Sequence, residues 1–374
     1  MSSKTIRLFH SPLRALAASL LITLFATEAV PQSVRGVAIH QGFHFTHHDW
    51  ELACDNTRTC RAAGYQADDA ERPVSLLLTR EAGAGAPVRA QLTLGDIDAD
   101  DASQSPVGAQ PLSLRLRVNG QQLGALPWLK DQQVYGLNPM QLRSVIQALP
   151  QPRAVVEVLH GDQTWRLSDR GAHAVLLKMD EAQGRLGTPG ALVRKGARPE
   201  GAVLPPLPAP VVKAVKVPAQ PVGGPTDQLP GLSPVAQATL QAQLVRSVID
   251  EHTQLSEPDH APAFSFHPLG GGVWLASTVC WTAAYNQGSC MWLIQQRAPH
   301  RPVLITDIAS DYQDGVITAS HKGRGIGDCW GHEEWTWDGR TFVHTRSATT
   351  GLCKLVTAGG AWDLPTLVAR VVRP

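Results

Sequence analysis

The sequence predicts an α+β fold in two parts. The N-terminal part is a mixed β-sheet with two helices, and the C-terminal part is a mainly antiparallel β-meander, curved or barrel-like, with one helix. Three observations predict this. Short apolar runs with period-two alternation recur in both halves. Helical spacing appears in only three places, and ten of the 28 prolines fall between residues 198 and 234, where they separate the halves.

The first residues have the pattern of a secretory signal peptide. Lys4, Arg7 and Arg14 form a positive region, and an apolar run over 16–25 follows them. Thr27-Glu28-Ala29 then offers small residues at the positions that a signal peptidase reads. We therefore expect residues 1–29 to be removed and the remainder to be periplasmic, with no stable membrane span after cleavage.

Composition excludes several classes of protein. The chain has 374 residues, 43% hydrophobic and 17% charged, with a formal net charge of +1. These values are typical of a globular protein, and the length allows two domains with separate cores. Without a basic tract the sequence gives no electrostatic basis for binding nucleic acid, and no such partner is expected.

A histidine-rich arm opens the mature chain. We expect a flexible arm over residues 30–42, followed by the N-terminal domain over 43–197. His40, His44, His47 and His48 lie around two phenylalanines, and imidazoles at these spacings offer metal ligands. No cysteine or carboxylate cluster completes a site, so solvent-facing histidines are the expected structure. We expect no metal and no cofactor, and metal capture by this arm stays open as an alternative.

Turn and cap signals divide the N-terminal domain into elements. Asn119-Gly120 and Gly161-Asp162 each mark a hairpin. Asn138-Pro139 is a cap followed by a first-position proline, and predicts a helix that ends before Pro150. The expected strands are 74–79, 88–94, 112–118, 121–126, 155–159 and 164–167, and the expected helices are 139–148 and 168–183.

Residues 198–232 are predicted to form a semi-rigid polyproline linker, because proline at this density excludes helices and central strands. The C-terminal domain then covers 233–374. Ser233-Pro234 predicts a helix to about residue 251. The expected strands are 273–280, 290–295, 302–305, 315–321, the hairpin around Asp338-Gly339 and 366–371.

The hairpin around Asp338-Gly339 carries the densest group of tryptophans. If these two residues form the loop, Trp337 faces Arg340, Trp335 faces Phe342 and Glu333 faces His344 on one side of the ribbon. We interpret Trp335 and Trp337 as core residues.

Six cysteines in an exported chain predict disulfides, and the absence of Cys-x-x-Cys removes the zinc-ribbon and thioredoxin-like interpretations. Cys54 and Cys60 lie alone in the N-terminal half and are expected to pair. Of the remaining pairings we prefer Cys280 with Cys290 and Cys329 with Cys353. A hairpin that turned at Asn286-Gln287 would not place Cys280 opposite Cys290, so this division stays open.

Candidate binding residues gather near the glycine-rich stretch 323–327. A phosphate loop needs a helix behind it, and here a strand follows. Arg324 and Asp328 flank the stretch and either pair with each other or form a polar recognition site. Exposed aromatic faces bind sugars and apolar groups, and Trp330, Trp281, Tyr285 and Asn286 are the candidates for such a platform.

Several segments, in this order along the chain, carry a family resemblance: HDWELACDNTRTC, VSLLLTREAG, MDEAQGRLGTPGALVRKG, WTAAYNQGS, and GRGIGDC with WTWDGRTF. With these segments the chain resembles the bacterial exported family known as domain of unknown function 1176. The resemblance covers nearly the whole mature chain except the proline stretch. It implies a periplasmic or envelope location, and it transfers no catalytic residues.

The sequence therefore favours a non-catalytic envelope protein that binds a partner protein or a peptidoglycan or other glycan component. The alternative is an envelope hydrolase of glycan or peptide with a carboxylate site that the sequence does not identify. No Gly-x-Ser-x-Gly elbow or helical zinc motif is present. A deep cleft with two carboxylates about 5 to 9 Å apart would favour glycan hydrolysis.

Overall fold

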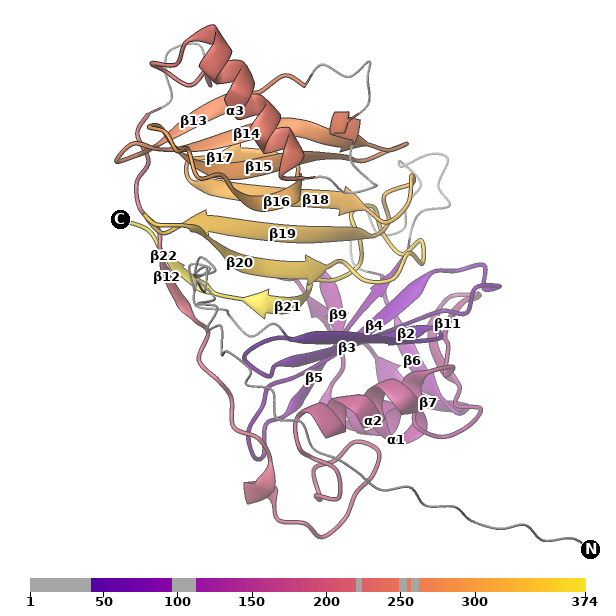
Figure 1. Ribbon diagram of the computed structural model, residues 1–374. Helices are drawn as coiled ribbons and strands as arrows, with labels where there is room; N and C mark the ends of the chain where they lie inside the picture. The colour runs from indigo at the N-terminus through magenta and orange to yellow at the C-terminus, as the bar shows by residue number, and fades with distance from the viewer. Residues whose placement is uncertain (1–41, 96–111, 220–223, 249–253, 257–261) are drawn as a thin grey trace, which may run out of the picture. The chain divides into compact units, whose positions relative to one another are not determined.

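The N-terminal half consists of two β-sheets and two helices, whose apolar residues share one core (Figure 1). The structure is a computed structural model that describes residues 42–95, 112–219, 224–248, 254–256 and 262–374. The expected signal peptide, most of the arm and His40 lie outside these residues. The elements of this half are β1 (Phe43–His47), β2 (Trp50–Cys54), β3 (Cys60–Tyr65), β4 (Val74–Arg80), β5 (Val88–Leu94), β6 (Arg115–Val118), β7 (Gln121–Ala125), β8 (Trp128–Leu129), β9 (Val134–Gly136), α1 (Pro139–Ala148), β10 (Val156–His160), β11 (Gln163–Leu167) and α2 (Ala172–Ala182).

The larger sheet has the order β1-β2-β3-β4-β5-β9-β8, and the smaller has the order β11-β10-β6-β7. All pairs in both are antiparallel, so the expectation of one mixed sheet was wrong. Hairpin connections join most of the neighbouring strands, and a hairpin reverses the chain direction. At the β6–β7 turn, Asn119 and Gly120 both have positive φ, as the sequence predicts.

Helix α1 forms where the sequence predicts it. The Asn138 side chain accepts hydrogen bonds from the backbone N–H of Met140 and Gln141, and the Gln141 side chain accepts from the Asn138 N–H. This capping box satisfies backbone donors that a helix start leaves unpaired. Val145 lies on the buried face of α1 and packs into the core that the two sheets share.

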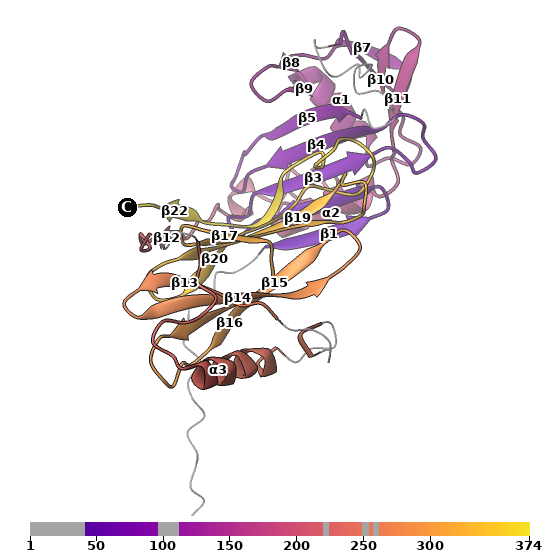
Figure 2. The same ribbon diagram turned by 90° about the horizontal axis from the view of Figure 1, so that it is seen from above.

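The C-terminal half has three layers: a helix, a four-stranded sheet and a five-stranded sheet (Figure 2). Leu240 and Leu244 of the helix pack on one face of the four-stranded sheet, and Trp337 of the five-stranded sheet belongs to the core on the other face. The elements are α3 (Pro234–Arg246), β13 (Ser265–Gly270), β14 (Val273–Thr282), β15 (Gln287–Gln295), β16 (Val303–Ala309), β17 (Asp311–Gln313), β18 (Val316–Lys322), β19 (Trp330–Trp337), β20 (Phe342–Thr349), β21 (Leu364–Val368) and β22 (Arg370–Val372).

Neither sheet of this half closes on itself, so the barrel-like expectation was wrong. Alternate residues of β14 point into two different cores, so the sheet buries both of its faces without closing into a barrel. Leu275 belongs to the core between the sheets, and Ala276 belongs to the core under α3. Both faces of the four-stranded sheet are therefore buried by separate layers.

The β19–β20 hairpin has a longer loop than the sequence predicts. Trp337 pairs with Phe342 and Trp335 with His344, a shift of two residues from the expected register. The Asp338 side chain accepts hydrogen bonds from the N–H of Arg340 and Thr341, which stabilises a four-residue loop. Because side chains alternate with period two, this shift leaves the aromatic residues on the expected face.

The proline-rich segment pairs with both halves along its length. Its first part includes a short 3-10 helix, η2 (Glu200–Ala202), and the Leu207 N–H donates to Thr57 O at 3.1 Å. Further along, β12 (Val211–Lys213) pairs in parallel with β22. Val217 is buried in the core between the two C-terminal sheets. A second 3-10 helix, η3 (Gln254–Ser256), follows α3.

Three disulfides are present, with the pairings that the sequence analysis preferred: Cys54–Cys60, Cys280–Cys290 and Cys329–Cys353. The first joins directly opposed residues of β2 and β3. The second forms because a β-bulge between Val279 and Trp281 displaces Cys280 from the regular ladder.

Candidate functional site

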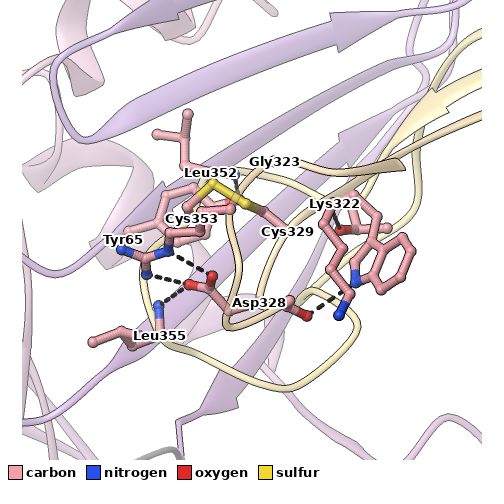
Figure 3. Close-up of a disulfide and its surroundings, with 12 residues drawn as sticks. Tyr65, Lys322, Gly323, Asp328, Cys329, Leu352, Cys353 and Leu355 are labelled. Carbon is pink, nitrogen blue, oxygen red and sulfur yellow. Dashed lines mark hydrogen bonds and ion pairs between the residues drawn. A yellow bond between two sulfur atoms is a disulfide. The ribbon is translucent and has the colours of Figure 1, made fainter. Parts of the chain in front are cut away.

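The glycine-rich stretch is a loop between β18 and β19 that is fixed by a buried carboxylate (Figure 3). Arg324 Nε donates to Asp328 Oδ1 at 2.7 Å, and the Leu355 N–H donates to Asp328 Oδ2 at 2.7 Å. Burial alone would raise the pKa of Asp328, but the hydrogen bonds from Arg324 and Leu355 outweigh burial and lower this pKa. Arg324 and Asp328 therefore pair with each other, one of the two alternatives from the sequence.

The Cys329–Cys353 disulfide lies against the same loop (Figure 3). A Cβ atom on Gly323 would lie 2.7 Å from Cys329 Sγ, so only glycine fits this approach. Asp328 Oδ atoms and the two sulfurs lie close together, but sulfurs joined in a disulfide offer no thiolate to a metal.

Asn286 and Tyr285 come from the turn between β14 and β15. The Asn286 side chain donates to Lys322 O and accepts from Lys322 N, both at 2.9 Å, so it continues the pairing at the end of β18. Tyr285 is 47% exposed and lies beside Gly325. Of the two, Tyr285 is the residue that presents its side chain to solvent.

Trp330 and Trp281 are both half-buried and have internal hydrogen bonds. Trp330 Nε1 donates to Gly327 O at 2.9 Å, and Lys322 Nζ lies 5.5 Å from the centre of the Trp330 ring. Trp281 Nε1 donates to Asp307 O at 2.9 Å. The structure thus brings Tyr285, Asn286, Arg324, Asp328 and Trp330 to one loop, where most of these side chains hold the loop in place.

Two buried acidic residues, Glu51 of β2 and Asp49 in the turn before it, form contacts that sequence reasoning missed. Glu51 Oε1 accepts hydrogen bonds from Tyr65 Oη at 2.6 Å and from the Leu352 N–H at 2.7 Å. Burial, followed by the Glu51 charge, raises the pKa of Tyr65. Asp49 Oδ1 accepts from Lys354 Nζ at 2.7 Å. Both carboxylates therefore fix the 350–355 segment of the C-terminal half.

The histidine-rich arm is only partly within the described residues. His44 Nε2 lies 2.8 Å from Glu51 Oε2, and the His47 and His48 rings contact each other edge to face. Among the described residues, these histidines do not belong to any group of three closely spaced metal-ligating atoms.

A large open cleft lies on the N-terminal half, away from all residues chosen from the sequence. Its volume is about 1260 Å³, larger than the roughly 300–1,000 Å³ of common small-molecule pockets. Residues of β3, β4, β5, β8 and β9, one face of α1, and the segments 189–195 and 360–363 line it.

Apolar residues make up most of the cleft wall. They include Leu77 of β4, Val88 of β5 and Val134 of β9. Helix α1 contributes Leu142 and Ile146, which lie one turn apart and are half-buried. This second apolar stripe on α1 was the one feature of the sequence that could have indicated the cleft. A stripe alone does not show whether another part of the protein or a ligand covers it.

Cations are more numerous than anions in the cleft wall. Arg61 is paired with Asp55 at 2.8 Å, and Arg89 with Glu81 at 2.8 Å. The other two cations, Arg143 and Lys195, are exposed and have no hydrogen bond or ion pair within the described part of the chain. The one carboxylate among the lining residues is Asp363, which is paired with Arg346.

The Trp362 side chain is part of the cleft wall. Its indole N–H donates to Ser75 Oγ at 2.7 Å, and its ring packs with Leu77 and Leu364 in a small core that both halves share. The cleft wall is therefore anchored by contacts between residues far apart in the sequence.

Comparisons with known proteins agree with the resemblance seen in the sequence. Residues 44–369 match the family described as protein of unknown function (DUF1176). The uncharacterized protein YpfG of Escherichia coli (strain K12) is 24% identical over 338 residues, which are 85% of this chain and 90% of that protein. No solved structure matches. Because the family match spans most of its length, this chain belongs to the DUF1176 family.

Proposed function

We propose that this chain is an exported, non-catalytic binding protein of the cell envelope, which holds part of a protein or cell-wall partner in the cleft beside α1. The observation that carries the proposal is the cleft itself. It is large, its wall is mostly apolar, and two of its cations have no partner within the described residues. Such a wall removes apolar surface of a ligand from water and orients it by charge.

The composition of the cleft wall supports binding more than hydrolysis. A glycosidase uses two carboxylates about 5 to 9 Å apart. Among the described residues that line the cleft, Asp363 is the one carboxylate, and it is paired with Arg346.

Export is supported by the three disulfides, because such bonds persist in oxidising compartments. The pattern of charged, apolar and small residues over 1–29 is the second support. Within the described residues, no helix combines the length and the apolar character that crossing a membrane requires.

The test compares two tryptophan substitutions on α1. Gln147→Trp fills the cleft from an exposed lining position, whereas Met140 is 51% exposed and does not line the cleft, so Met140→Trp is the matched control. Each protein is expressed with its leader, isolated from the periplasm, incubated with envelope extract and analysed by native mass spectrometry.

We expect a processed N-terminus and a bound component on the wild-type protein and on Met140→Trp, with about tenfold less on Gln147→Trp. An uncleaved leader on cytosolic protein would remove the export half of the proposal. Equal loading of all three proteins, no loading of any, or digestion of isolated cell-wall material would overturn the binding half.

A further inference from the structure

We infer that the ligand of the cleft is a single-chain anionic amphiphile, for example a long-chain carboxylate. Its apolar chain lies along the α1 side of the cleft and its acidic head binds the cations Arg143 and Lys195. This inference rests on the proposed binding function of the cleft, but it assigns the cleft to a free amphiphile of the envelope in place of part of a protein or cell-wall partner.

The apolar part of the cleft is continuous along one helix face. Pro139, Leu142 and Ile146 recur at intervals of three and four residues, which places them in line on α1. Leu129 of β8 and Leu192 add apolar surface from other elements. A row of this kind covers an extended hydrocarbon chain, and each buried methylene contributes about 0.8 kcal/mol.

The charged part of the cleft selects the sign of the head group. Arg143 lies one turn from both Pro139 and Ile146 on α1, and Lys195 follows Leu192 in the segment 189–195. Both are exposed and unpaired among the described residues, so neither charge is neutralised by the protein itself. An acidic head group supplies the missing counter-charge.

Other ligand classes are less well matched by the lining residues. A peptide presents backbone donors and acceptors at every residue and needs partners for them, but Gln91 and Gln132 already bond to each other at 2.6 Å. A sugar needs an exposed aromatic face. Trp362, the one aromatic residue among the lining residues, is only 9% exposed.

The test uses three probes below their micelle concentrations in calorimetric titrations of the delipidated full chain. Dodecanoate is the ligand probe, hexanoate has the same head on a shorter chain, and dodecyltrimethylammonium has the same chain with the opposite charge. We expect saturable binding of dodecanoate at one site. Six methylenes at about fourfold each allow a loss of affinity of up to about 4,000-fold for hexanoate. A loss of at least about 100-fold is expected. The cationic probe is expected to bind at least about tenfold more weakly than dodecanoate.

Charge reversal separates this site from nonspecific binding. The double variant Arg143→Glu with Lys195→Glu is expected to lower the affinity for dodecanoate by at least about tenfold. It is also expected to bind the cationic probe more tightly than dodecanoate. The control, Arg115→Glu with Arg297→Glu, changes the net charge equally at exposed positions outside the cleft and is expected to leave both affinities unchanged.

The outcomes distinguish the ligand class from the binding function. If dodecanoate does not bind, or if both charge signs bind equally, the amphiphile inference is wrong. If, in addition, the wild-type protein binds a component of the envelope extract, such as a peptide, and Gln147→Trp binds less of it, the cleft remains a binding site for another ligand. Equal weakening by the control pair would also overturn the inference.

Discussion

At the scale of single residues, buried carboxylates hold the C-terminal loops of this protein. Asp328 is 2% exposed and binds both Arg324 and the Leu355 backbone. Glu51 has a comparable role towards Leu352. The Arg324–Asp328 pair was one of the two alternatives that the sequence left open, because the two residues flank the glycine-rich stretch. The sequence gave no sign of the Leu355 contact, which depends on tertiary packing.

Asp328 gives a prediction about pH. Its folded pKa is lower than the roughly 3.9 of an unfolded aspartate. Its contribution to stability is therefore complete above that value and is lost as the pH falls through the folded pKa. Asp328→Asn is expected to cost about 2 kcal/mol of unfolding free energy at pH 7 and to reduce the loss of stability on acidification, measured by urea unfolding between pH 7 and 3.

Asp363→Asn is the matched control, because Asp363 also pairs with an arginine, Arg346, but its side chain is 64% exposed. Exposed pairs contribute about 0–1 kcal/mol. An effect of Asp363→Asn as large as that of Asp328→Asn would contradict the importance given to burial.

At the scale of elements, cap and turn residues correctly predicted where several helices and turns begin. Asn138 fixed the start of α1, Ser233 that of α3, and Asn119-Gly120 the β6–β7 turn. These signals act within a few residues, so the local sequence contains them. The β19–β20 register depends on the Asp338 side chain, which selects a longer loop than the Asp-Gly pair alone predicts.

The β14–β15 hairpin gives a prediction about glycine. A Cβ atom on Gly288 would lie 2.2 Å from the Trp281 ring, whereas one on Gly331 would meet no atom within 4 Å. Gly288→Ala is expected to cost about 1–3 kcal/mol through overpacking, and Gly331→Ala to change stability by at most about 0.5 kcal/mol. Urea unfolding of both variants tests this, and similar values for the two would refute it.

The cleft is also a property of several elements together, and no part of it was predicted from the sequence. Each strand contributes one or two residues with ordinary core character, such as Leu77 and Val134. Arg143 and Lys195 are ordinary exposed cations in the sequence. Only the arrangement of the strands around α1 places these residues in one wall.

At the scale of the molecule, contacts cross between the sequence regions expected to form separate domains, 43–197 and 233–374. A hydrophobic cluster contains Ala53, Tyr65 and Leu77 together with Trp362 and Leu364. Polar contacts surround it, including the bond from the Gln66 side chain to Lys354 O at 2.6 Å. Such contacts favour joint unfolding of the regions.

We therefore expect one cooperative transition in calorimetry, with the same midpoint by tryptophan fluorescence and far-ultraviolet circular dichroism. Lys354→Met removes the ion pair with Asp49 and is expected to lower this midpoint by several degrees without dividing the transition. Two separate transitions in the wild-type protein, one for each region, would contradict the expectation.

The parallel pairing of β12 with β22 has a consequence for proteolysis. Val211 to Lys213 belong to the proline-rich segment, yet they align with Arg370 to Val372 near the end of the chain. A single cut between Arg198 and Pro210 would leave β12 attached to the C-terminal fragment, and the cluster around Trp362 would still connect the two fragments. The nicked protein should therefore elute from a sizing column as one complex and separate only in denaturant.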